Sequence, residues 1–252
     1  MRRGTATDAA FAMTMAIMIV IAHAVAYLTH EYSHSFTAWA LGYMSNPFAL
    51  DYGGTTPGNL ILLSDVGDNV QYAPILNGGH GLAVAAIALS GPFVGNALLY
   101  VFLHAIASRV RTLSPGVSSF TFWLLLMCAG NVWSYVPIRA ITTHADIAIA
   151  ASGLHVSVLA LFPVLLIPSL LVVGHFFARA CPQFIPISAA GSSARTAVTI
   201  SVTTAWFFVV FGGAGLSGSY GQVAQAFSLV SALGLLPLAT VWLWRRCTVA
   251  AD

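Results

Sequence analysis

His30-Glu31-Tyr32-Ser33-His34 forms an HExxH pattern inside an apolar run that extends over about 9–43. Side chains four positions apart share one face of an α-helix, so His30 and His34 can bind the same metal ion. Glu31, the next residue round the helix, then points toward a water molecule at the metal. Two hydrogen-bonded core histidines beside a paired glutamate would give the same pattern. We favour a metal site, because Glu31 is the chain's single glutamate and membranes rarely keep an unpaired carboxylate.

The composition indicates a polytopic membrane protein. Of 252 residues, 58% are hydrophobic and 6% charged, with a mean hydropathy of +0.87, whereas a soluble domain is typically about 25% charged. The nine basic residues are all arginines spread over loop ends, so the sequence offers no basic patch for nucleic acid. Cys128, Cys181 and Cys247 lack the CxxC spacing of metal sites and imply no disulfide framework.

The apolar runs predict an all-α fold with about six transmembrane helices in a single membrane domain, residues 1–252. The predicted helices cover about 9–43, 80–107, 118–136, 154–177, 197–216 and 223–244. A polar loop over 45–79 follows the first helix. Its short apolar piece, residues 60–63, suits a strand of a β-hairpin.

The arginines predict the orientation of these helices. Arginine falls at alternate helix ends and is absent from the 45–79 loop, so the positive-inside rule places both termini in the cytoplasm. We therefore expect an integral membrane protein, of a bacterial inner membrane. The arginines that follow the rule are Arg2, Arg3, Arg109, Arg111, Arg179, Arg195, Arg245 and Arg246. Arg139 is the exception, and His144 and Asp146 are its nearest possible partners.

This topology brings four polar features to a similar depth in the outer half of the membrane. They are the HExxH segment, Gly91-Pro92 in the second helix, Asn131 in the third, and Asp146 after the break at Pro137. We expect Gly91-Pro92 to mark a kink or a close-packing point. A site at this depth would draw water from the non-cytoplasmic face, with the 45–79 loop as its lid.

Three motifs carry a resemblance to a known family. Residues 30–42, HEYSHSFTAWALG, match HExxHxxxAxxxG at every fixed position. Gly91-Pro92 followed by Asn96 matches a GP-then-Asn element, and Asn131, Pro137 and Asp146 match a later Asn–Pro–Asp element. With these motifs the chain resembles the site-2 protease type of intramembrane zinc metalloprotease, the M50 peptidases.

The resemblance covers a metalloprotease-like core over about 9–150, and additional helices follow over about 154–246. It implies Zn²⁺ bound by His30, His34 and Asp146, with Glu31 as the catalytic base. The implied activity is hydrolysis of peptide bonds in membrane-embedded protein segments.

The residues themselves leave the third metal ligand open. A catalytic zinc takes three protein ligands and keeps one position for water. Asp146 and His144 are both candidates, and another group is a further alternative. Asp146 also fits a capping box with Thr143 at the start of a short helix.

Asn96 and Asn131 are candidates for positioning the substrate. A peptide held in a membrane helix has its carbonyls hydrogen-bonded internally, so it must unwind before attack. An asparagine amide offers both a donor and an acceptor to such an unwound strand. Hydrogen bonding between helices explains either residue equally well.

Two other functions remain compatible with the sequence. One is a non-proteolytic metal-binding scaffold or regulator with the same fold. The other is a haem or redox protein with axial ligands among His104, His155 and His175.

Overall fold

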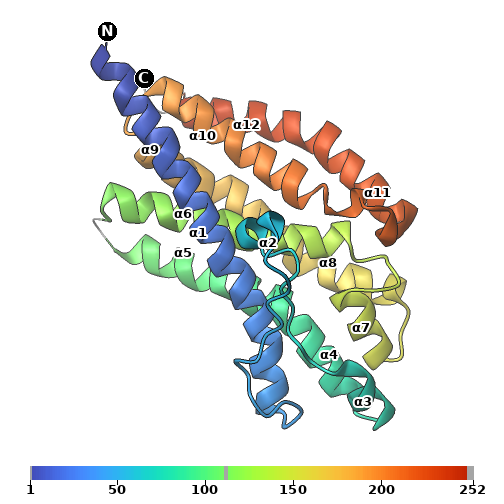
Figure 1. The fold of residues 1–252 in the computed structure, drawn as a ribbon. Helices are drawn as coiled ribbons and strands as arrows, with labels where there is room; N and C mark the ends of the chain where they lie inside the picture. The colour runs from blue at the N-terminus through green and yellow to red at the C-terminus, as the bar shows by residue number, and fades with distance from the viewer. Residues whose placement is uncertain (1, 111–112, 249–252) are drawn as a thin grey trace.

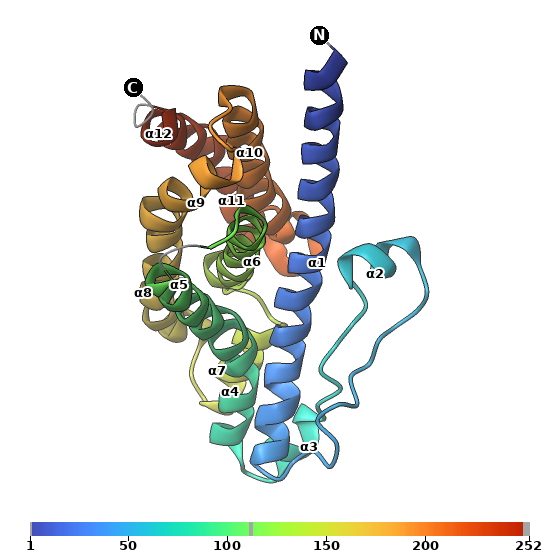
Figure 2. The same cartoon turned by 90° about the vertical axis from the view of Figure 1, so that its left-hand side faces the viewer.

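The computed structural model describes residues 2–110 and 113–248, and these fold as a bundle of helices (Figure 1). Six helical segments are long and apolar enough to cross a membrane, which confirms the predicted all-α polytopic fold. They cover Thr7–Ala40, Gly81–Arg109, Pro115–Ile138, Val158–Ser188, Ser193–Leu216 and Gly221–Thr248. Both ends of the described chain lie at the same end of the bundle, as an even number of spans requires (Figures 1 and 2).

The first span is one uninterrupted helix, α1 (Arg2–Ala40), and each of the other five contains a π-helical segment. The helices of the later spans are α4 (Gly81–Ser90), η1 (Gly91–Leu98), α5 (Leu99–Arg109), α6 (Pro115–Trp133), η2 (Ser134–Ile138), α8 (Val158–His175), η3 (Phe176–Ala180), α9 (Cys181–Ser188), α10 (Ser193–Ala205), η4 (Trp206–Phe211), η5 (Ala214–Leu216), α11 (Gly221–Leu229), η7 (Val230–Leu235) and α12 (Leu236–Thr248). Outside the spans lie α2 (Pro57–Leu62), α3 (Tyr72–Asn77), α7 (Asp146–Gly153) and η6 (Gly218–Tyr220). π-Helical turns are frequent at functional sites, and η1 and η2 both contribute residues around His30.

The helix α6 forms the centre of the bundle. Its side chains Phe122, Leu125 and Met127 are completely buried. Figure 2 shows α1, α5, α8 and α10 arranged around α6. A membrane helix enclosed in this way packs only against protein, so α6 provides a fixed wall for α1 and its HExxH segment.

The loop between the first two spans differs from the predicted hairpin. Residues 60–62, expected in a strand, lie in the helix α2, because Thr56 caps its N-terminus by accepting a hydrogen bond from the Asn59 amide and Pro57 occupies the first turn. The strand prediction was therefore wrong at this position. In the described residues, β pairing in this loop is limited to one antiparallel bridge between Asp51 and Gly67.

After α2 the chain runs back along α1, and we call residues 62–68 the strap. His23 Nε2 donates to the Leu62 carbonyl at 2.9 Å, and Tyr27 Oη donates to the Val66 carbonyl at 3.2 Å. Ser35 Oγ donates to the Asp68 carbonyl at 2.8 Å. The strap therefore follows the stripe of α1 that carries the two motif histidines. Figure 2 shows α2 folded back beside the middle of α1, as a lid over this face requires.

Candidate metal centre

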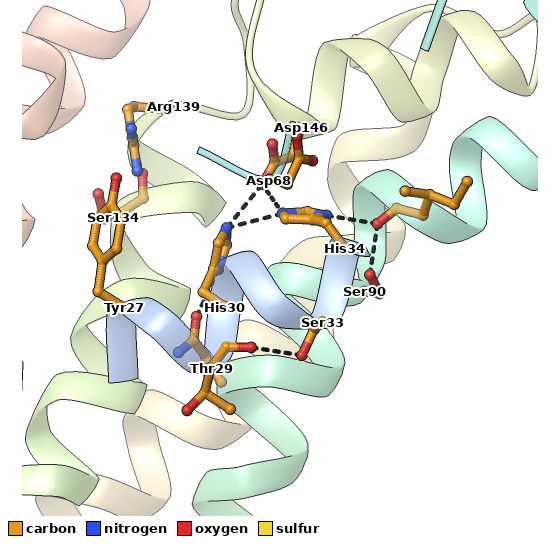
Figure 3. Close-up of polar contacts among 12 residues, drawn as sticks. Tyr27, Thr29, His30, Ser33, His34, Asp68, Ser90, Ser134, Arg139 and Asp146 are labelled. Carbon is orange, nitrogen blue, oxygen red and sulfur yellow. Dashed lines mark hydrogen bonds and ion pairs between the residues drawn. The ribbon is translucent and has the colours of Figure 1, made fainter. Parts of the chain in front are cut away.

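His30 and His34 of α1 meet Asp146, the first residue of α7 (Figure 3). The Nε2 atoms of the two histidines lie 3.2 Å apart. Asp146 Oδ2 lies 3.2 Å from Nε2 of His30 and 3.3 Å from Nε2 of His34. The histidines are buried, with exposed fractions of 2% and 1%. These three residues form a group that can hold a metal ion.

The outer hydrogen bonds fix which ring nitrogens face the centre of the group. His34 Nδ1 lies 2.7 Å from the Ile87 carbonyl, which can only accept, so Nδ1 carries the proton. His30 Nδ1 lies 2.8 Å from Asn96 Oδ1, while Nδ2 of the same amide donates to the Ala26 carbonyl at 3.0 Å. The neutral rings therefore direct the lone pairs of both Nε2 atoms toward Asp146. Metal-binding histidines in proteins are held by the same kind of outer contact.

The spacing of the three atoms matches one face of a coordination tetrahedron. Zinc binds histidine nitrogen and carboxylate oxygen at about 2.0–2.2 Å, which separates tetrahedral ligand atoms by about 3.3–3.5 Å. Two imidazole lone pairs and a carboxylate oxygen repel one another at such distances unless a cation lies among them. Protons on both Nε2 atoms would relieve the two contacts with Asp146 but would leave the two N–H groups facing each other at 3.2 Å. The donor set of two nitrogens and one oxygen therefore suits a divalent metal with one open position.

Glu31 lies beside this group without belonging to it. Its side chain is 7% exposed and makes no hydrogen bond or ion pair with any described residue. Charges on His30, His34 and Asp146 are close enough to act on its carboxylate. A carboxylate that is nearly buried, unpaired and adjacent to the ligand atoms is available to a water molecule at the open position.

Glycines allow η1 to approach α1 closely at the motif. A Cβ atom on Gly95 would come within 2.7 Å of the Thr29 carbonyl oxygen and 2.8 Å of His30 Cα. A Cβ on Gly91 would meet the two ligand nitrogens themselves. The predicted packing role of Gly91-Pro92 is therefore correct, and Gly91 also leaves the space in which an ion fits.

Tyr135 and Arg139 lie beside His30 in an arrangement that the sequence did not predict. The Tyr135 ring stacks on His30 with centroids 4.6 Å apart, and the Arg139 guanidinium lies 4.3 Å above the same ring. Arg139 donates to the Ser134 carbonyl and to Tyr220 Oη, instead of pairing with His144 and Asp146 as expected. Burial acts against the charge, but Tyr135, Tyr220 and Asp146 together raise the pKa of Arg139. An aromatic residue four positions after Asn131 was the available sequence signal.

His144 does not reach the two motif histidines. Its ring stacks on Tyr220 with centroids 4.7 Å apart, and its Nδ1 lies 3.3 Å from Thr142 Oγ1. The capping alternative for Asp146 is also absent, because Ala145 occupies the N-cap of α7 without a side-chain hydrogen bond. Burial alone would raise the pKa of Asp146, but the adjacent His34 and His30, when they are protonated, lower it well below its usual range. Asp146 is thus held as a carboxylate facing the histidines.

The two asparagines differ in what their amides do. Both ends of the Asn96 amide are engaged by His30 and Ala26, and its side chain is fully buried. Asn96 therefore orients a histidine and has no amide group left for a substrate. Asn131 is also buried, yet its amide makes no hydrogen bond within the described part of the chain. Of the two candidates, Asn131 is the one free to bind a further group.

Asp68 of the strap completes the polar surroundings. Figure 3 shows it beside Asp146. Its Oδ2 accepts from Tyr72 Oη at 2.6 Å and its Oδ1 accepts from the Val70 amide at 3.0 Å. Burial, and then the neighbouring Asp68 charge, raise the pKa of Tyr72, so its hydroxyl stays protonated as a donor. Both carboxylate oxygens of Asp68 are thereby engaged, which leaves Asp146 as the free acidic ligand.

No protein-family model, curated protein or solved structure matches the chain. The motif residues and the geometry of the metal centre are therefore the basis of the function proposed below.

Proposed function

We propose that this protein is an intramembrane zinc metalloprotease, similar to site-2 proteases, that hydrolyses peptide bonds of membrane-embedded protein segments. The observation that supports this most is the arrangement of His30, His34 and Asp146. Their ligand atoms form a tetrahedral face with edges of 3.2–3.3 Å, and both histidine tautomers are set by outer hydrogen bonds. The proposed location is a bacterial inner membrane, with both termini in the cytoplasm.

The donor set favours zinc among common divalent metals. Two neutral imidazoles and one carboxylate, with room for water, are typical of catalytic zinc, whereas magnesium and calcium prefer oxygen ligands in larger numbers. Bound here, zinc would polarise a peptide carbonyl and make an adjacent water molecule more acidic.

Glu31 is proposed as the general base. Its unpaired carboxylate would take a proton from the attacking water and return it to the departing amine. Asp146 and the two histidines would hold the cation, while Asn96 and the Ile87 carbonyl keep the imidazole rings in the required orientation. A glutamine at position 31 would preserve the shape and remove the proton transfer.

The depth of the site supports a membrane-embedded substrate. Gly91, which contacts both ligand histidines, lies ten residues after the start of the Gly81–Arg109 span, or about 15 Å along the helix axis at 1.5 Å per residue. The group therefore lies within the membrane-spanning helices, nearer the end at which this span begins. Asn131 is the residue proposed to hold an unwound substrate strand, because its amide is uncommitted.

The test compares the parent with Glu31→Gln and His34→Ala, and with Asp65→Asn as a matched control that removes a carboxylate outside the group. Metal analysis of the purified proteins should find zinc in the parent, Glu31→Gln and Asp65→Asn, but little in His34→Ala. Membrane proteomes should contain a full-length single-pass protein in Glu31→Gln and His34→Ala cells that is cleaved in the other two. Identical proteomes, with all four proteins expressed and zinc bound to the parent, would instead identify a non-proteolytic metal-binding scaffold. Absence of zinc from the parent would refute both.

A further inference from the structure

A second candidate site lies between α5 and α8, outside the metal centre. It is a groove of about 620 Å³ with mainly apolar walls. Its polar side chains are grouped, because Tyr100 and His104 both contact His175 and Arg179 lies about one helical turn beyond it. The residues that line it are Tyr100, Val101, His104, Ala105, Leu170, Leu171, Val172, Gly174, His175, Ala178 and Arg179. The metal ligands take no part in it, so it is independent of the proposed protease function.

The polar end carries a cation without an acidic partner. Arg179 is exposed in the span Val158–Ser188 and forms no ion pair with any described residue. None of the lining side chains is acidic. An arginine on a membrane helix needs either an anion or access to the polar interface. The groove therefore presents a positive charge where an anion from outside the protein can pair with it.

Two histidines and a tyrosine stand next to Arg179. Tyr100 Oη lies 2.8 Å from His175 Nδ1, and a hydroxyl that donates there leaves the proton of the neutral ring on Nε2. His104 packs edge-on against His175 with centroids 4.5 Å apart. Contact this close leaves no room for a porphyrin between the two rings, which argues against the haem alternative. The cluster instead adds N–H donors to the guanidinium.

The apolar part suits a single acyl chain. Val101 is 53% exposed, Leu170 49% and Leu171 69%, so the walls face the lipid side of the bundle. A Cβ atom on Gly174 meets nothing within 4 Å, and the groove is open at that point. Leu170 and Arg179 are nine positions apart, or about 14 Å along a helix, close to half of a hydrocarbon core of about 30 Å.

From this arrangement we infer that the groove binds an acidic glycerophospholipid of the leaflet at the end of the bundle that carries the termini. Its phosphate pairs with Arg179 and accepts from the histidine cluster, and one acyl chain lies along Leu170 and Val101. A guanidinium binds phosphate through paired N–H donors. A zwitterionic lipid fits less well, because its own cation would enter a region that already holds an unpaired arginine.

The test is native mass spectrometry of the full-length protein after exchange into detergent with phosphatidylglycerol or phosphatidylcholine. Three variants are compared with the parent: Arg179→Gln removes the cation, Gly174→Leu fills the open part of the groove, and Arg245→Gln removes an exposed arginine of α12 outside it. The Cβ atom of Gly174→Leu meets nothing within 4 Å, and circular dichroism verifies that all variants have the helicity of the parent. Inorganic phosphate is included as a competitor.

The parent and Arg245→Gln should retain phosphatidylglycerol, in preference to phosphatidylcholine, at equal levels. Arg179→Gln should lower the retained fraction by about fivefold or more, the effect of losing one charged contact at a membrane surface. Gly174→Leu should also lower it, because the leucine side chain occupies the space of the acyl chain. Millimolar inorganic phosphate should not displace the lipid, because it lacks the acyl chain. Equal retention of both lipids, unchanged retention in Arg179→Gln, or displacement by phosphate would overturn the inference.

Discussion

Gly91 lies directly against the imidazole of His34: a Cβ atom at position 91 would fall 2.6 Å from His34 Cε1 and 2.7 Å from His30 Nε2. Because Gly91 has no side chain, the space around both ligand nitrogens stays open. A methyl group there would compete with the ion for the same volume. This contact connects a small residue in the second span with the chemistry of the first.

We expect Gly91→Ala to lose most of its zinc, retaining less than about one-tenth of the parent's occupancy, because two ligands must move to admit the methyl group. Gly234→Ala is the control, since a Cβ at that position in the sixth span meets nothing within 4 Å. Metal analysis of both purified variants, with circular dichroism to verify equal helicity, measures the effect. Full zinc occupancy in a folded Gly91→Ala protein would show that the ion, if bound, lies elsewhere.

Asn96→Ala removes the acceptor for His30 Nδ1 and the donor to the Ala26 carbonyl. Loss of an outer partner of this kind typically lowers metal affinity by about 10–100-fold. Competition with a chelator of known affinity would measure the change. An unaltered affinity would mean that the packing of the ring against Tyr135 is sufficient to orient it.

Asn131→Ala separates substrate binding from metal binding. Its amide makes no hydrogen bond in the described structure, so zinc affinity should stay at the parent's value. If Asn131 holds the unwound substrate, cleavage of a membrane substrate should nevertheless fall by about tenfold, the effect of one lost hydrogen bond to a substrate. If Asn131→Ala loses zinc and cleavage to the same extent, Asn131 instead stabilises the metal centre.

The sequence predicted the features that depend on local periodicity. Six apolar runs gave six spans, and the four-residue spacing of His30 and His34 placed both rings on one face. The limits of the fourth span were predicted less accurately, as about 154–177. In the structure it begins at Val158, after the N-cap Ser157, and continues through η3 to Ser188.

Features that depend on contacts between distant segments were missed. The carbonyl of Ile87 that orients His34 belongs to the backbone, so the residue type at position 87 could not predict this hydrogen bond. The strap is anchored by the carbonyls of Leu62 and Val66, each 39 positions from its α1 donor. Residues 60–62 were assigned to a strand from their own apolar character, although Thr56 and Pro57 upstream start a helix.

Tyr27→Phe should loosen the strap over the metal centre. The change removes one hydrogen bond to the Val66 carbonyl while the ring remains, a loss of about 1 kcal/mol or roughly fivefold in the opening equilibrium. If opening limits access, chelator should strip zinc from Tyr27→Phe about fivefold faster than from the parent. Tyr43→Phe is the matched control, because its hydroxyl makes no hydrogen bond with the described residues. Equal stripping rates in all three proteins would exclude the strap as the barrier.

The orientation in the membrane is the remaining prediction. Arg109, Arg195, Arg245 and Arg246 lie within three residues of the end of a span, and Arg179 lies nine residues before the end of the fourth span. All five are in the half of the bundle that carries the termini; Arg111 lies outside the described residues. Arg139 is at the opposite end, but it is enclosed by Tyr135 and Tyr220 and is therefore not a free loop charge. The positive-inside rule then places the termini in the cytoplasm.

Reporter fusions after Ser192 and at the C-terminus should accordingly report a cytoplasmic location, and fusions at Asp65 and Gly218 the opposite side. Arg139→Gln should leave all four signals unchanged, since its charge is satisfied inside the protein. The metal centre lies nearer the end of the bundle with α3 and α7, so this orientation supplies its water from the non-cytoplasmic face. A cytoplasmic signal at Asp65 together with a non-cytoplasmic C-terminus would show that the orientation is the reverse of the one predicted. The strap would then control access from the cytoplasm, and the proposed substrate would have to be cut from that side.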